Sequence, residues 1–104
     1  MKFEVKADAG GHYTWRLYSG SQMVAWAGES FYSRSNAVRA AEAFKVGAAT
    51  ARYEVYLDAG SKYRWRAWRS SSKVASSGES FASRSNAQRA ADNVRDNAGK
   101  ATGP

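Results

Sequence analysis

The sequence predicts an α+β protein: a tandem duplication of a β-β-β-α unit that forms one antiparallel sheet of roughly six strands, with two helices packed on one face. Two observations lead to this prediction. Residues 3–50 align without a gap with residues 53–100, and half of the aligned positions are identical. Each copy also passes from the two-residue period of strands to the 3.6-residue period of a helix. A repeat of fixed length indicates that both copies adopt nearly the same fold.

We assign residues 1–50 to the first repeat and residues 51–104 to the second. The whole chain of 104 residues has the length of one ordinary domain. A unit of about 50 residues would bury too little of its surface to be more than marginally stable alone. We therefore expect the two repeats to share one core.

The first two strands of each repeat follow from alternation. Phe3, Val5 and Ala7 alternate with charged residues, and residues 53–57 resemble this segment. An Asp-Ala-Gly turn follows in both copies. A second alternating segment then begins at Tyr13 in the first repeat, with its counterpart 50 residues later. Each repeat therefore starts with a β-hairpin.

A third strand is expected over residues 22–27 and 72–77, after a turn of serine and glycine. Its orientation is ambiguous, because Val24 and Ala25 are both suitable residues for the buried face, as are their counterparts 50 residues later. The pattern therefore predicts the strand but leaves its facing open.

A helix follows the third strand in each repeat, with Ser33 or Ser83 as its N-cap. The expected buried stripe of the first helix is Ala37, Ala40, Ala41, Phe44 and Ala48. A stripe made mostly of alanine lets the helix approach the sheet closely, so we expect large aromatic side chains of the sheet to fill the core. The final residues, 100–104, are expected to be frayed.

Composition excludes several classes of protein. The net charge of +7 favours polyanionic partners, while the absence of cysteine excludes disulfides and thiolate metal sites. No segment approaches the roughly 18 apolar residues of a membrane span, so we expect a cytoplasmic protein that does not bind membranes. No Ser/His/Asp set, glycine-rich phosphate loop or metal-ligand cluster is recognisable. We therefore expect a non-enzymatic protein without a cofactor.

Several spaced motifs occur in order in both copies, including Tyr13-x-Trp15-Arg16 and Gly28-Glu29-Ser30-Phe31. In these motifs the chain resembles the YegP-like family of small uncharacterised bacterial and archaeal proteins. The resemblance implies three strands and a helix per repeat, assembled into one sheet. It also implies a further strand after the last helix, which crosses to the partner repeat. Residues 100–104 are too short for that strand, so we expect it to be missing. The family supplies no activity and no functional residue.

The best candidate for a binding site is the sheet face that the helices leave open. Basic and aromatic residues are expected to project from it, and Trp26 is a further candidate. The candidate residues are Arg16, Tyr18, Lys62, Arg64, Arg66, Trp68 and the neighbouring Arg69. Guanidinium groups bind phosphates and rings stack on bases, so this face is suited to DNA or RNA. The second copy, which holds most of these residues, is the more basic one.

Two other interpretations of this face remain open. Its arginines can form cross-strand ion pairs on a solvated surface, with Glu4 and Glu54 as the obvious partners. Alternatively, the face mediates self-association or binds an acidic protein, because Tyr18 and Trp68 would be exposed on it.

Two smaller constellations are weaker candidates. Arg34 and Arg84 lie at the helix starts, where free N–H groups and the helix dipole favour anions, although helix capping explains the surrounding serines without a ligand. Glu29 and Glu79 occupy equivalent positions, and two carboxylates that meet can perform acid/base chemistry. We expect each glutamate instead to pair with an arginine or to accept from a helix-start N–H.

Overall fold

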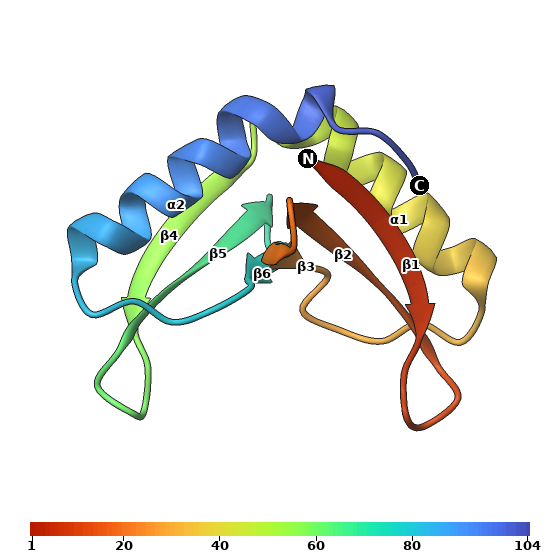
Figure 1. Ribbon diagram of the computed structural model, residues 1–104, viewed down its shortest axis with the longest axis horizontal. Helices are drawn as coiled ribbons and strands as arrows, with labels where there is room; N and C mark the ends of the chain where they lie inside the picture. Colours follow the sequence, from red (N-terminus) through yellow and green to blue (C-terminus); the bar gives the residue numbers. More distant parts are fainter.

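The computed structural model describes residues 1–104 as a six-stranded antiparallel sheet with two helices on one face (Figure 1). The elements are β1 (Lys2–Ala7), β2 (Tyr13–Ser19), β3 (Gln22–Trp26), α1 (Arg34–Gly47), β4 (Arg52–Leu57), β5 (Tyr63–Arg69), β6 (Ser72–Ser77), α2 (Arg84–Asn97) and the short 3-10 helix η1 (Ala98–Lys100). The predicted fold class and element order are confirmed. We refer to residues 1–50 as the first half and to residues 51–104 as the second.

The strands lie in the order β1-β2-β3-β6-β5-β4, so the two halves meet in the middle of the sheet. At this junction Ala25 pairs with Ser77 and Trp26 pairs with Ser76, both antiparallel. Gly78 follows β6 directly, and its N–H donates to the carbonyl oxygen of Val24 at 3.3 Å. The edges of the sheet are therefore β1 and β4.

Strand register is the same in both halves. Glu4 lies opposite Arg16 on β1 and β2, as Glu54 lies opposite Arg66 on β4 and β5. A register shift also recurs between the second and third strands of each half, next to Leu17 in the first. The bulge explains why the facing of the third strand could not be predicted: Ala25 is buried, and its neighbour Val24 also packs against the core.

The core lies between the sheet and the helices, and its largest side chains come mainly from the sheet. Trp15 stacks on Phe44 with ring centroids 5.1 Å apart, and Phe3 meets Trp15 edge to face at 5.5 Å. Ala37 and Ala41 of α1 are fully buried. The expected close approach of an alanine-rich helix to an aromatic-bearing sheet is confirmed.

Both helices begin as expected. The Ser33 hydroxyl accepts from the N–H of Asn36 at 3.1 Å, and Ser83 caps α2 in the same way through Asn86. Neither helix is long and apolar enough to cross a membrane.

The expectation that the C-terminus is frayed is wrong, although no further strand follows α2. Thr102 forms a parallel bridge with Lys2 of β1. The N–H of Phe3 donates to the carbonyl oxygen of Thr102 at 2.9 Å, and the N–H of Thr102 donates to that of Met1 at 3.0 Å. Residues 101–104 are long enough to reach β1, because η1 carries the chain from the end of α2 to the start of β1 (Figure 1).

Candidate nucleic-acid interface

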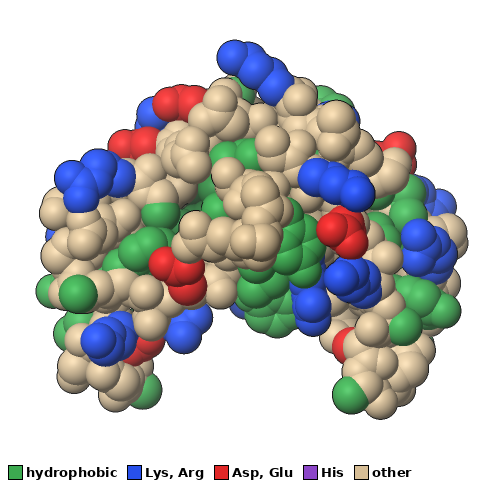
Figure 2. Space-filling model, viewed as in Figure 1, with side chains coloured by type: hydrophobic (Ala, Val, Ile, Leu, Met, Phe, Trp, Pro, Cys, Tyr) green, Lys and Arg blue, Asp and Glu red, His purple; other side chains and the backbone are tan.

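The sheet face opposite the helices, here called the open face, is not covered by any element. Both helices lie on the upper side in Figure 1, and the β1–β2 and β4–β5 turns project downward on either side. The space-filling view shows that the molecule is hollowed between these turns, beneath the middle of the sheet (Figure 2). Figure 2 shows apolar side chains in the middle of this hollow, with basic side chains beside them. The face has room for an extended ligand between the two projecting turns.

Strand pairing places one row of side chains across the whole open face. Neighbouring members of this row are cross-strand partners, so they project from the same side of the sheet. In order from β1 to β4 the row is Glu4, Arg16, Trp26, Ser76, Arg66 and Glu54. Each end of the row is therefore a glutamate, the next residue inward is an arginine, and Trp26 lies near the middle.

Arg66 is held firmly on the second half of the face. Its Nε donates to Glu54 Oε1 at 2.6 Å, and its Cζ lies 4.1 Å from the ring centroid of Tyr56. The Trp68 indole N–H donates to the same glutamate oxygen at 3.1 Å. The hydrogen bond from Arg66, followed by that from Trp68, holds the pKa of Glu54 below its usual value. Arg66 is therefore compensated by an acid and packed between rings.

Arg64 is paired as well. Its Nε donates to Asp58 Oδ2 at 2.9 Å. Asp58 also accepts from the backbone N–H groups of Lys62 and Gly60 in the β4–β5 turn. The bond from Lys62 and the bond from Arg64 are the main causes that lower the pKa of Asp58. The interpretation with cross-strand and local ion pairs is thus realised at two of the candidate arginines, Arg64 and Arg66.

The first half is arranged differently, although Glu4 and Arg16 are identical to their counterparts. Lys6 replaces Tyr56, and its Nζ lies 3.5 Å from Glu4 Oε1 and 5.7 Å from the ring centroid of Tyr18. Lys6 therefore forms the ion pair with Glu4, and Arg16 forms none. Arg52 on β4 also has no acidic partner, and its guanidinium carbon lies 5.8 Å from the ring centroid of Trp68.

The open face has an excess of positive charge. Its strands present seven basic residues and two acids on this side: Lys2, Lys6, Arg16, Arg52, Arg64, Arg66 and Lys73 against Glu4 and Glu54. Four aromatic side chains, Tyr18, Trp26, Tyr56 and Trp68, lie among them. Lys2, Arg16, Arg52 and Lys73 are the basic residues of this face without an ion pair in the structure.

The structure brings together most of the predicted candidates. Arg16, Tyr18, Arg64, Arg66 and Trp68 all project from the open face. Lys62 lies exposed at the end of the β4–β5 turn, next to this face.

Arg69 is the exception among the candidates, because its placement on the open face is wrong. It follows Trp68 in the alternation of β5, so its side chain projects toward the helices and lines a pocket beside Ala43 of α1. Four members of the open face were missed: Lys2, Arg52, Tyr56 and Lys73. The alternation of the first strand of each half would have revealed the first three. Lys73 faces this side because of the register shift beside it, which no alternation indicates.

The helix-start arginines lie against the edge strands. Arg34 donates to the carbonyl oxygen of Val5 at 3.2 Å, and Arg84 donates to that of Val55 at 3.4 Å. The Arg84 guanidinium carbon also lies 5.3 Å from the ring centroid of Tyr63. These contacts connect each helix start to an edge strand, which gives both arginines a structural role.

The two equivalent glutamates do not form a carboxylate pair. Glu79 lies in a pocket under α2, where it accepts from Gln22 Nε2 at 2.5 Å, whereas Glu29 lines a separate pocket beside α1. No three histidine, aspartate or glutamate side chains gather closely enough to hold a metal ion.

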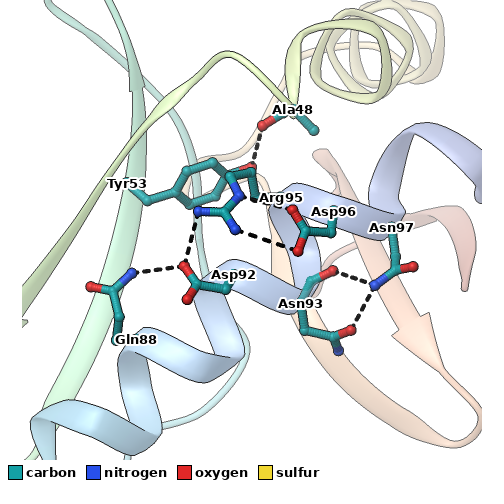
Figure 3. A network of polar contacts seen from close by, with 8 residues as sticks. All are labelled: Ala48, Tyr53, Gln88, Asp92, Asn93, Arg95, Asp96 and Asn97. Carbon is teal, nitrogen blue, oxygen red and sulfur yellow. Dashed lines mark hydrogen bonds and ion pairs between the residues drawn. The ribbon is translucent and has the colours of Figure 1, made fainter.

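A polar network on the helix side leaves no free cation at Arg95 (Figure 3). Arg95 donates to Asp92 at 3.2 Å and to Asp96 at 2.9 Å. The Tyr53 hydroxyl, beside Arg95, donates to the carbonyl oxygen of Ala48 at 2.8 Å. Burial raises the pKa of Tyr53 above its usual value. The network therefore joins α2, the start of β4 and the end of α1.

The fold is similar to that of a UPF0339 protein from Shewanella oneidensis, whose structure was determined in solution by NMR. The two structures align with a TM-score of 0.78 over 94% of this chain and 84% of that chain, at 14% sequence identity. A likeness at this level of identity concerns the fold alone. No protein-family model matches the chain. No curated protein matches its sequence.

Proposed function

We propose that this chain is a small, non-enzymatic, YegP-like protein that binds single-stranded nucleic acid through its open face. The observation that carries the proposal is the uncovered and hollowed sheet face, on which seven basic residues and four aromatic rings accompany only two acids. The family assignment is supported by the shared fold and by the motifs that occur in both halves, such as Gly28-Glu29-Ser30-Phe31.

The chemistry of the face suits a polyanion with exposed bases. Four basic side chains have no acidic partner and therefore have most to gain from a phosphate: Lys2, Arg16, Arg52 and Lys73. Tyr18 and Trp68 lie next to the basic side chains of Lys6 and Arg52, and their rings can stack on nucleobases. The faces of nucleobases are accessible only when the strand is unpaired. Arg66 contributes less, because Glu54 already compensates its charge.

Size also favours a single strand over direct reading of a duplex. Six strands spaced by about 4.8 Å span roughly 24 Å. The major groove of B-DNA is only about 12 Å wide, so the complete sheet cannot enter it. A single strand can instead lie across the face, in the hollow between the two projecting turns (Figure 2).

The proposal is tested by the salt dependence of binding to a labelled single-stranded oligonucleotide, measured by fluorescence anisotropy. Each phosphate contact contributes a slope of about −0.7 to log K against log salt on single strands. The double variant Arg16→Ala with Arg52→Ala should therefore lose about 1.4 from the magnitude of the slope. The matched control is Arg39→Ala with Arg89→Ala, which removes two arginines from the helices.

The control should keep the wild-type slope. Absence of binding at low salt, or an equal loss in both double variants, would remove the open face as the binding site. Tighter binding to a duplex than to the single strand would retain the face but change the ligand.

A second candidate function is self-association through the same face. It is favoured by Trp26, which lies half-buried at the junction of β3 and β6, where no element covers it. Sedimentation at increasing concentration tests it. A dimer that dissociates in Trp26→Ala would support this candidate, whereas a monomer at all concentrations would contradict it.

A further inference from the structure

A pocket of about 320 Å³ opens beside the β5–β6 turn, where the end of α1 and its connection to β4 meet the sheet. Its lining includes Phe44, Thr50, Arg52, Trp68, Arg69 and Ser70. Arg52 and Trp68 also belong to the open face, so the pocket adjoins the proposed binding surface at one end. Its volume lies at the lower end of the range of roughly 300 to 1,000 Å³ for small-molecule sites.

The lining combines two uncompensated cations with an aromatic wall. Neither Arg52 nor Arg69 forms an ion pair. Two guanidinium groups are suited to a doubly charged phosphomonoester, which they can bind through several parallel hydrogen bonds. Trp68 and Phe44 provide flat apolar surface of the kind on which a base stacks.

The negative end of α1 also points toward this region, but it is largely compensated. The carbonyl oxygen of Gly47 accepts from the backbone N–H groups of Thr50 and Ala51 at 3.1 and 3.0 Å. The Thr50 hydroxyl donates to the same oxygen at 3.3 Å. The helix end therefore offers little repulsion to an anion held by the two arginines.

The pocket has no counterpart in the first half, although the two halves share their fold and register. Its distinctive residues Trp68, Arg69 and Ser70 correspond to Tyr18, Ser19 and Gly20. On the helix side, Ala43 and Gly47 correspond to Asn93 and Asn97, whose side chains occupy the equivalent helix positions and bond to each other at 2.8 Å (Figure 3). The pocket therefore arises where the halves differ.

Ser70 adds an independent feature. Its φ of 54° lies in the left-handed region, where the equivalent Gly20 has a φ of 63°. Glycine adopts this conformation without strain, whereas serine does not. The second half thus holds a strained residue with a hydroxyl at the rim of the pocket, as is often seen at ligand sites.

We infer that this pocket binds the phosphomonoester of a nucleotide, with Arg52 and Arg69 on the phosphate and the base against Trp68. The inference rests on the proposed function and extends it, because it assigns the phosphorylated end of a strand to the end of the open face. A free nucleoside monophosphate has the same chemistry, so the experiment separates the two sources.

The test uses isothermal titration calorimetry with adenosine 5′-monophosphate, with adenosine, and with one oligonucleotide carrying either a 5′-phosphate or a 5′-hydroxyl. The diagnostic variant is Arg69→Ser with Ser70→Gly, which introduces the residues of the first half. These positions lie outside the open face, so binding of the 5′-hydroxyl oligonucleotide should be unchanged. We expect the monophosphate to bind at least about tenfold more tightly than adenosine, and the variant to lose this preference.

Each outcome decides the inference. A preference for the 5′-phosphate strand that disappears in the variant supports strand-end binding. Variant-sensitive binding of the monophosphate without a strand-end preference supports the pocket with a free nucleotide as its ligand. If the monophosphate does not bind, or binds equally to the variant, the inference is wrong. The proposed function is then still judged separately, by the 5′-hydroxyl oligonucleotide.

Discussion

Glu54 and Arg66 face each other across β4 and β5, and Arg66 Nε donates to Glu54 Oε1 at 2.6 Å. The identical residues Glu4 and Arg16 face each other across β1 and β2 but form no ion pair. Two neighbouring positions differ between the halves, because Lys6 and Tyr18 correspond to Tyr56 and Trp68, and the Trp68 indole also donates to Glu54. Tyr56 packs against Arg66, whereas Lys6 at the equivalent position pairs with Glu4 and leaves Arg16 unpaired. The two halves therefore share a backbone but differ in which bases are available.

The substitution Glu54→Gln should tighten binding of single-stranded nucleic acid. It removes an acid from the open face and releases Arg66 for a phosphate, so the salt slope should become steeper by about 0.7. Anisotropy titrations over a range of salt concentrations measure this change. Glu42→Gln on α1 is the control, because it makes the same change of charge on the helix side. Equal effects of the two substitutions would show that overall charge, and not Arg66, determines affinity.

Stability should fall steeply in acid. Four carboxyl groups have pKa values below their usual values: Asp8, Glu54, Asp58 and Asp96. The leading cause in each case is a hydrogen bond, donated respectively by Ser30, Arg66, the Lys62 backbone N–H and Arg95. At pH values near these pKa values the unfolded chain binds more protons than the folded one. The stabilisation is therefore complete above the usual values of 3.8 for aspartate and 4.5 for glutamate, and is lost as pH falls through the folded values.

Urea unfolding between pH 7 and pH 2 tests this prediction. The midpoint should stay nearly constant down to about pH 5 and then decrease. Asp58→Asn keeps an oxygen for the turn N–H groups but removes the charge that pairs with Arg64, so its midpoint should decrease less on acidification. A variant with the same acid dependence as the wild type would show that Asp58 contributes nothing to it.

The equivalent glycines at the ends of β3 and β6 should respond differently to alanine. A Cβ at Gly78 would overlap the carbonyl oxygen of Met23 on the neighbouring strand, so Gly78→Ala should cost about 2 kcal/mol or more. A Cβ at Gly28 would meet mainly the side chains of Ser76 and Lys73, which can move, although the φ of 77° adds strain. We expect a cost of about 1 to 2 kcal/mol there.

The free energies of unfolding of Gly78→Ala and Gly28→Ala in urea decide this prediction. The larger loss should belong to Gly78→Ala. A larger loss for Gly28→Ala would mean that backbone conformation outweighs the contact between β3 and the residue after β6.

Relief of strain at the β5–β6 turn should stabilise the fold. Ser70→Gly places glycine at a φ of 54°, and the gain should be about 0.5 kcal/mol after the entropic cost of glycine is subtracted. Gly20→Ser in the first half should have the opposite effect. Thermal unfolding of both variants measures the two changes. A stabilising effect of Gly20→Ser would contradict the assignment of strain.

The fold was predictable because the strongest signals in the sequence are local and occur twice. Alternation at Phe3 and Val5, the serine N-cap at Ser33 and the alanine stripe of α1 each determine a local structure, and the folded chain contains all three. The C-terminal segment escaped prediction because its contacts are long-range: Thr102 finds its partners at Met1 and Phe3, and nothing in a five-residue tail indicates them.

The candidate site was only partly predictable, for a related reason. Alternation gave the correct face for Arg16, Arg64 and Arg66, but alternation from Trp68 also places Arg69 on the opposite side of the strand. Which bases are free depends on side-chain geometry. Glu4 faces Arg16 but pairs with Lys6, and no periodicity in the sequence distinguishes these two arrangements.

The contact between Thr102 and the first three residues brings the two ends of the chain together in space. The N-terminus and the C-terminus therefore lie next to each other beside β1. The order of the strands in the sheet does not require the termini to be at this position. A circular permutant that joins Pro104 to Met1 and begins at Ala51 would hold the same six strands in the same neighbourhood, with the two halves exchanged in order of synthesis.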